Sequence, residues 1–295
     1  MTIQTEIKFM HTYCTTQMSP LIIYQVKLFI LCRKKEKLSN GETALALQIS
    51  AHVAKEHGSV LIFSWEMSKT EFCERYLSSQ TPVNLFKSPT KDEVARLISK
   101  AGELSDPSKF PIYVDDKPPG LQQLLRRIEI GVREHKPALI VIDYLQLIHG
   151  ARGDNRNQQI GEITMSLKRV AQEYGVTVLA LSQLSRFSQH RANKNEIADE
   201  PRLSDLRDSG SIEQDSDKVL FIHNKQPRND GDQDDIESPT NQPQGNASGE
   251  RDIILAKSRS SACGRTSVYW NGEHGKFYAT DGWHGTHAPD EEPVF

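Results

Sequence analysis

A glycine, an acid and a hydroxyl stand at the start of a predicted helix, in the segment LSNGETALALQIS at residues 38–50. A phosphate-binding P-loop has the pattern G-x-x-x-x-G-K-[ST] before a helix, and its backbone N–H groups surround phosphate oxygens. Gly41 and Thr43 occupy the second glycine and the hydroxyl positions, and Ala44 continues into the helix. Glu42 occupies the lysine position. The segment therefore predicts a nucleotide-binding loop whose central charge is reversed.

Three further polar residues follow apolar runs. Asp143 ends LIVID, the pattern in which an acid helps to hold Mg²⁺, and the hydroxyl of Thr43 is the expected second Mg²⁺ contact. Glu66 follows VLIFSW and could orient or deprotonate a water, or it could be a helix N-terminal charge favoured by the dipole. Gln183, in VLALSQ, could sense a terminal phosphate or cap a loop. These alternatives stay open from the residues alone.

The elements that must position these residues alternate between strands and helices. Strands are expected at 27–32, 59–65, 111–116, 137–148, 176–184 and 218–226. Helices are expected at 43–57, after the N-cap Ser68, and at 90–101, 121–135 and 158–174. Near-continuous apolar strands between helices predict a parallel α/β sheet, in which ligands bind beyond the carboxyl ends of the strands. The segments 251–260 and 265–279 predict a β-hairpin at the end of the sheet.

Composition excludes several classes of protein. The net charge of −3 gives no general basic field for nucleic acid, although a local basic stripe could still bind it. The four cysteines never form C-x-x-C, which argues against a zinc site or a disulfide scaffold and fits a reducing cytoplasm. The most apolar early stretch, 21–32, is too short to span a bilayer. We therefore expect a cytoplasmic protein without a membrane partner.

Five blocks of sequence, taken together, resemble one family. They are IFSWEMS, LIVIDYLQLI, EITMSLKRVAQEYGVTVLALSQLSR, RLSDLRDSGSIEQDSDKVLFIH and IILAKSRS. In this order they resemble the signature blocks of the C-terminal ATPase domain of DnaB-type replicative helicases, from about residue 43 to about residue 275. The resemblance implies a RecA-like fold with ATP and Mg²⁺ as cofactors. It also implies a homo-hexameric ring that moves 5′ to 3′ along single-stranded DNA, with a primase or helicase loader as a further partner.

The resemblance also implies roles for single residues. Glu66 resembles the catalytic base, Asp143 the Walker B acid and Gln183 the residue that links nucleotide state to DNA. Lys257 and Arg259, in KSRS, resemble the pair that reaches into the neighbouring subunit's site as an arginine finger. The stretch between 184 and 218 resembles the DNA-facing loops, and its basic residues are Arg186, Arg191, Lys194, Arg202 and Arg207. A solvated loop is the alternative for Arg191 and Lys194, and an interface salt bridge is the alternative for Arg207.

The chain departs from the family pattern before Thr43. Glu36 stands at the first glycine position of the P-loop, and Glu42 replaces the lysine. The first 20 residues show no clear period and cannot supply the family's N-terminal helical domain. A frameshift, a recombination scar or a misassigned start would each produce such an abrupt loss of resemblance. We expect a RecA-like domain over 21–280 with a disordered loop at 227–250, and a tail at 281–295.

Two functions remain open at this point. The first is an ATP-dependent helicase motor of phage or prophage origin, weakened by Glu42. The second is a RecA-like module that binds DNA or joins a ring without turning over ATP. A related recombination or repair ATPase is a third reading, which the block SDLRDSG makes weaker.

Overall fold

The structure is a computed structural model that describes residues 28–33, 41–81, 90–117, 120–183, 200–224 and 248–280. Nine strands of these residues form a single sheet in the order β3-β2-β4-β5-β1-β6-β7-β8-β9. The strands are β1 (Leu28–Arg33), β2 (Val60–Ser64), β3 (Ile112–Asp115), β4 (Leu139–Asp143), β5 (Thr177–Gln183), β6 (Lys218–Asn224), β7 (Gly249–Ser258), β8 (Gly264–Asn271) and β9 (Lys276–Ala279).

The first six strands are parallel, and the last three are antiparallel additions. β1 lies between β5 and β6, with Ile30 opposite Ala180 on one side and Val219 on the other. β7 runs back along β6, β8 along β7, and β9 along β8. The parallel strands are apolar on both faces because helices cover both faces of the sheet. All five residues of β4, for example, are buried.

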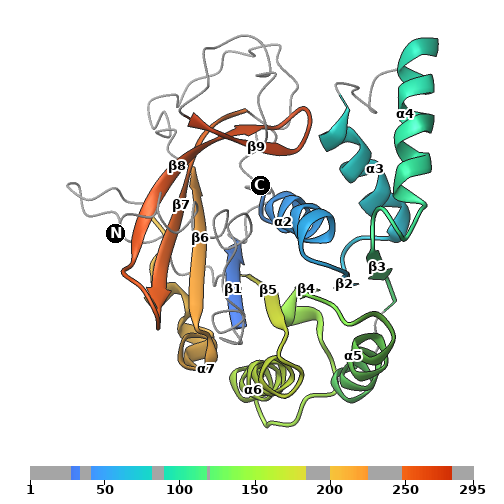
Figure 1. The fold of residues 1–295 in the computed structure, drawn as a ribbon. Coiled ribbons are helices and arrows are strands. Elements are labelled where there is room, and N and C mark those ends of the chain that lie inside the picture. The colour runs from blue at the N-terminus through green and yellow to red at the C-terminus, as the bar shows by residue number, and fades with distance from the viewer. Residues whose placement is uncertain are drawn as a thin grey trace, which may run out of the picture.

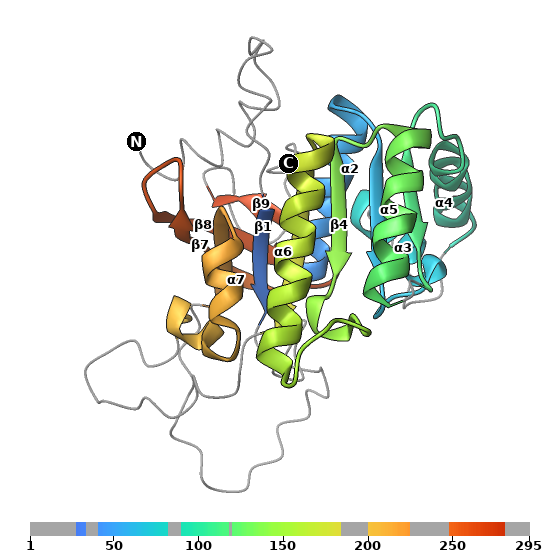
Figure 2. The ribbon, with the colours of Figure 1, turned by 90° about the horizontal axis from the view of Figure 1, so that it is seen from below.

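Helices lie on both faces of this sheet (Figure 1). One face carries α2 (Glu42–Glu56) and α3 (Lys69–Gln80), with α4 (Lys91–Leu104) beside α3. Figure 2 shows the opposite face, where α5 (Leu121–His135), α6 (Arg156–Tyr174) and α7 (Gly210–Asp215) lie side by side. Each face has its own apolar cluster, so the sheet separates two hydrophobic cores.

Local sequence signals set the helix ends. Ser68 and Glu71 form a capping box at the start of α3, since the Ser68 hydroxyl accepts from the Glu71 N–H and the Glu71 carboxylate accepts from the Ser68 N–H. Asn155 caps α6 through Gln158 N–H. Gly175 ends α6 with a left-handed φ of 64°, a conformation that glycine adopts without strain.

The expected order of strands and helices is confirmed, with three differences. β4 stops at Asp143, and a short 3₁₀ helix, η1 (Leu145–Leu147), replaces the rest of the predicted strand. The stretch expected to be loop before β6 contains a 3₁₀ helix, η3 (Leu203–Ser209), followed by α7, because Leu206 and Ile212 are buried against the core. The C-terminal hairpin extends into a second hairpin, β8–β9.

Several expectations fall outside the described residues: the segment 1–20, Glu36, most of the loop 227–250, and the tail 281–295. The last two residues of that loop, 249 and 250, belong to β7. Among the helices that the structure describes, none combines the length and the apolar character that crossing a bilayer requires.

Candidate functional site

Glu66, Asp143, Gln183 and the start of α2 lie at the carboxyl edge of the parallel strands. Asp143 is the last residue of β4, and Gln183 is the last residue of β5. Ser64, the last residue of β2, stands opposite Asp143, and Glu66 follows two residues later. α2 begins at the same edge, since it follows β1. The backbone therefore brings the ends of β2, β4 and β5 and the start of α2 to one edge of the sheet.

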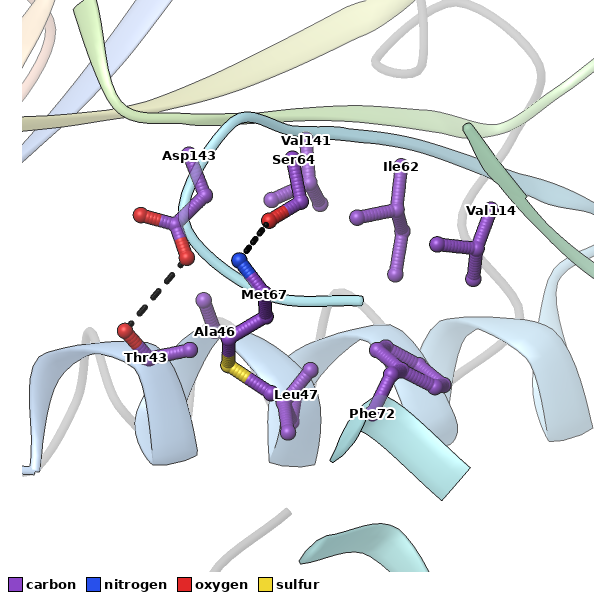
Figure 3. A pocket seen from close by; sticks show the side chains of 10 residues that line it. All are labelled: Thr43, Ala46, Leu47, Ile62, Ser64, Met67, Phe72, Val114, Val141 and Asp143. Atoms are coloured by element: carbon purple, nitrogen blue, oxygen red, sulfur yellow. Dashed lines mark hydrogen bonds between the residues drawn. The ribbon is translucent and has the colours of Figure 1, made fainter. Parts of the chain in front are cut away.

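Thr43 and Asp143 form the centre of this edge. The Thr43 Oγ1 hydroxyl lies 3.4 Å from Asp143 Oδ2, and both residues are buried. Figure 3 shows the pair at one end of a small cavity that α2, β2, β4 and neighbouring elements enclose. The cavity holds about 10 Å³, close to the smallest volume that admits one water molecule. Its remaining walls are mostly apolar, so the two oxygens are its principal polar feature together with Ser64.

A glycine with a left-handed backbone stands directly before α2. Gly41 has a φ of +93°, which a residue with a side chain rarely adopts, and its carbonyl accepts the N–H of Leu45 at 2.8 Å. Glu42 is the first helical residue and is 1% exposed. Burial raises the pKa of the neighbouring Cys32 thiol, and the charge of Glu42 raises it further. Glu42 therefore lies inside the protein, at the start of α2.

Two aromatic residues from the C-terminal strands rest against Gly41. A methyl group added there would come within 2.7 Å of Phe277 Cζ and 3.0 Å of Trp270 Cζ3. Gln48 of α2 fixes the same strand, because its Nε2 donates to Phe277 O at 2.9 Å and its Oε1 accepts from Phe277 N at 3.0 Å. The end of the sheet thus packs directly on the first turns of α2.

Gln183 is held through its backbone. Gln146 of η1 accepts from Gln183 N–H at 3.0 Å and donates to Gln183 O at 3.1 Å and to Ser182 Oγ at 2.9 Å. One side chain therefore ties the end of β5 to the segment after Asp143. A movement of the Gln183 backbone would therefore also move Gln146 and the segment that follows β4.

Glu66 stands at the same edge and is exposed to solvent. The turn that presents it is fixed by two hydrogen bonds: Trp65 N donates to Asp143 O at 2.9 Å, and Met67 N donates to Ser64 Oγ at 2.8 Å. Glu66 therefore directly follows Trp65, whose backbone is hydrogen-bonded to the last residue of β4. An exposed carboxylate at this edge of the sheet is accessible to water.

Lys257 and Arg259 lie at the opposite edge. Ser258, between them, pairs with Lys218, the first residue of β6. Lys257 Nζ donates to Ser216 O at 2.9 Å and to Glu213 O, and Arg259 donates to Gln214 O. Burial and the nearby charge of Arg259 lower the pKa of Lys257. The structure therefore does not bring this pair to the Thr43–Asp143 centre of the same chain.

Asp217 joins three segments at that amino edge. It accepts from Leu28 N at 2.8 Å, forms an ion pair with Lys168 of α6, and lies 3.9 Å from Arg259 Nη1. Its own N–H donates to Leu28 O at 2.9 Å. The start of β1, α6 and the tip of β7 therefore meet at one carboxylate.

The basic residues expected to face DNA are only partly described. Arg186, Arg191 and Lys194 lie outside the described residues, and so does the side chain of Arg207. Arg202 is exposed, and its N–H donates to Asp205 Oδ2 at 2.7 Å at the start of η3. The position of Arg202 on the surface is compatible with a phosphate contact, which needs a charged group that reaches solvent.

Sequence reasoning missed Gln146, Asp217 and Arg251. Gln146 lies inside the quoted block LIVIDYLQLI, but it was included in a predicted strand rather than recognised as a bridge. Arg251 is 2% exposed in β7, where a charged residue flanking the apolar run IILA was the available signal. A long cation at the end of a buried strand must have a polar partner.

The donor set fits Mg²⁺ at Thr43 and Asp143, because hard oxygen ligands suit this ion and it usually takes one or two carboxylates with the substrate phosphates. The residues that the structure describes contain no group of three or more His, Cys, Asp or Glu side chains that could hold a metal alone. The start of α2 fits phosphate through its backbone and its positive dipole end. Glu42 alone does not fit, since its carboxylate repels phosphate.

A family model described as the DnaB-like helicase C terminal domain matches residues 27–279. The match begins before residue 43, so it includes β1 and the P-loop segment that the signature blocks alone left out. The fold is RecA-like. A solved structure described as an ATPase domain superposes with a TM-score of 0.70 at 27% identity, over 86% of this chain and 84% of that one. A DnaB-like replicative helicase, described with its interactions with primase, gives 0.69 at 28% identity, over 86% and 57%.

Curated relatives agree with this assignment. The replicative DNA helicase DnaB of Geobacillus stearothermophilus is 36% identical over 250 residues, 81% of this chain and 50% of the relative. The probable replicative DNA helicase of Trieres chinensis is 33% identical over 252 residues, 81% of this chain and 51% of the relative. The chain spans about half the length of both relatives. With a family match over most of its length and a superposable fold, the chain belongs to the DnaB-like helicase C-terminal domain family.

Proposed function

We propose that the chain is the ATP-hydrolysing motor domain of a DnaB-type DNA helicase that moves 5′ to 3′ along single-stranded DNA in replication. The observation that carries this proposal is the buried Thr43–Asp143 pair at the carboxyl edge, beside the start of α2. Ligands bind at this edge in open α/β sheets, and helix N-termini bind phosphate. Family membership supports the reaction class.

The chain's own residues then have separate tasks. Thr43 and Asp143 would hold Mg²⁺, which neutralises charge on a transferred phosphoryl group when it is bound. Glu66, exposed at the same edge, orients the attacking water and accepts its proton. Gln183 reports the state of the site to the segment that follows β5, with Gln146 fixing its backbone against the end of β4.

Lys257 and Arg259 act in a neighbouring subunit. They stand at the amino edge of the sheet, away from Thr43 and Asp143 of the same chain, so only another protomer can bring such a pair to a nucleotide. An arginine that stabilises charge on the transferred phosphate contributes about 10³–10⁵ in rate. This arrangement supports a homo-oligomer, and the resemblance implies that the oligomer is a hexamer.

The remaining partners follow from the same proposal. Single-stranded DNA is contacted by Arg202 and by Arg186, Arg191, Lys194 and Arg207, through phosphates and without reading sequence. A primase or helicase loader is the expected protein partner in the cytoplasm. One solved neighbour is described with its interactions with primase, which supports this choice.

A module without ATPase activity is the second candidate, and Glu42 is the observation that favours it. Two unit charges 4 Å apart interact by about 4 kcal/mol at an effective dielectric near 20, so a carboxylate where a lysine is usual opposes phosphate binding. Such a module would bind DNA or join a ring without turnover.

Steady-state ATP hydrolysis with and without single-stranded DNA separates the two candidates. DNA-stimulated hydrolysis that is lost in Asp143→Asn supports the motor, with Asp154→Asn, an exposed loop position, as the matched control that retains activity. DNA binding by a chain that does not hydrolyse ATP at any DNA concentration supports the inert module. Hydrolysis that is unchanged in Asp143→Asn would refute the assignment of the site.

A further inference from the structure

Arg251 lies at the same edge as the candidate site, although it comes from the last part of the sheet. β7 runs antiparallel to β6, and Arg251 stands opposite Asn224, the last residue of β6. Because β6 is parallel to β1, the end of β6 lies at the carboxyl edge where α2 begins. The register therefore places Arg251 at the edge of the sheet where α2 begins.

The strand alternation places Arg251 on the α2 face. Side chains two residues apart on a strand point to the same face. Ile253 belongs to the apolar cluster that contains Leu45 and Ile49 of α2, whereas Ile254 belongs to the cluster on the other face. Arg251 therefore points to the side of the sheet that α2 covers.

Arg251 is buried and held. It is 2% exposed, and its Nη1 donates to Asn224 Oδ1 at 2.9 Å and to Glu250 O at 3.1 Å. Both contacts are made by Nη1, one of the three nitrogens of a planar guanidinium that carries five N–H donors.

Glu42 provides the opposite charge. It is 1% exposed at the first position of α2, at the same edge and on the same face. A buried charge is unfavourable unless an opposite charge compensates it. Burial lowers the pKa of Arg251, and the charge of Glu42 raises it again. Two residues 209 positions apart thus carry compensating charges beside the phosphate-binding turn.

We propose that Arg251 supplies the positive charge of the phosphate-binding site in place of the P-loop lysine, with Glu42 as its buried counter-ion. The inference rests on the proposed motor function and names the residue that binds the phosphates of a nucleoside triphosphate. Guanidinium matches phosphate oxygens with two parallel hydrogen bonds, and a carboxylate behind it fixes its orientation. In this proposal the negative charge stands at position 42, where the P-loop lysine is usual, and the positive charge stands on β7 at Arg251.

The exchange predicts that single and paired substitutions differ. In Glu42→Lys an ammonium replaces the counter-ion beside a buried guanidinium, so the chain melts at a lower temperature and binds nucleotide no better than the parent. Arg251→Gln removes the cation, and its affinity for nucleotide falls at least tenfold. The double variant Glu42→Lys with Arg251→Gln moves the cation to the loop and recovers both the parent's melting temperature and its affinity.

The measurement is binding of fluorescently labelled ADP with Mg²⁺, together with thermal unfolding without nucleotide. Where Arg251→Gln does not fold, the variant Glu42→Gln with Arg251→Gln, which removes both charges, serves in its place and is expected to bind at least tenfold more weakly. Parent-like binding by either variant, or tighter binding by Glu42→Lys at an unchanged melting temperature, overturns the role of Arg251 and leaves the motor proposal standing. Failure of both the folded parent and the folded double exchange to bind Mg-ADP overturns the motor proposal and this inference with it.

Discussion

Gly41→Ala tests whether the end of the sheet rests on the turn at Gly41 that begins α2. The φ of +93° is a conformation that costs a residue with a side chain about 1–2 kcal/mol. The added methyl would also lie 2.7 Å from Phe277 Cζ, and Phe277 is fully buried and tied to Gln48 by two hydrogen bonds. Overpacking of this kind costs about 1–3 kcal/mol, which makes the total about 2–5 kcal/mol.

Gly175→Ala is the matched control. It has a φ of +64° with nothing within 4 Å of the added methyl, so it loses only the conformational part, about 1–2 kcal/mol. Urea denaturation of the two variants and the parent, with equal slopes, gives the free energies of unfolding. In a Phe277→Leu background, Gly41→Ala should lower the free energy of unfolding by less than it does in the parent, because the smaller side chain relieves part of the overpacking. Equal losses in Gly41→Ala and Gly175→Ala would refute the contact between β9 and the turn.

Three other results follow from the described contacts. Arg259→Ala should lower DNA-stimulated ATP hydrolysis about 10³-fold or more. Its unfolding free energy should fall by no more than about 1 kcal/mol, because the Arg259 side chain is 53% exposed and its contacts with Gln214 O and Asp217 are open to solvent. Lys257→Ala, which loses its bonds to Glu213 O and Ser216 O, should lower both; equal stability of the two variants contradicts this. Asp217→Asn should lower the free energy of unfolding, measured by urea denaturation, by about 1–3 kcal/mol. The loss should be smaller than for a fully buried ion pair, because the side chains of Lys168 and Asp217 are partly exposed to solvent. Hydrogen bonds from Ser68 lower the pKa of Glu71 below its ordinary 4.5. The parent should therefore be more stable than Glu71→Gln at pH 7, and this difference should disappear as the pH falls through the lowered pKa. A difference in melting temperature that stays constant from pH 7 to pH 3 would contradict this.

The parts of the fold that could be predicted share strong local signals. The apolar runs before Asp143 and Gln183 and the capping residue Ser68 each fix an element by a pattern within a few residues. Because parallel strands end at one edge, placing the strands was enough to place Asp143 beside the start of α2. The contact with Thr43 followed from topology.

The parts that could not be predicted depend on contacts between distant segments. Arg251 is far from Glu42 in sequence, and only the antiparallel register of β7 brings it to the same edge. α7 is six residues long, too short for a clear helical period, so the Glu213 carbonyl that Lys257 contacts was not foreseen. Strand pairing over such separations leaves no mark in any local window of sequence.

The placement of the Thr43–Asp143 pair and the Lys257–Arg259 pair at opposite edges has a consequence for symmetry. If the cationic pair serves a neighbour, as proposed, the contact between protomers joins unlike surfaces and is heterologous. In a two-fold dimer the same surface of each copy would have to carry both the Thr43–Asp143 pair and the cationic pair, because the contact joins like surfaces. In a closed head-to-tail ring, every contact between neighbours completes one centre, so there are as many centres as copies. In an open head-to-tail chain, there is one complete centre fewer than there are copies.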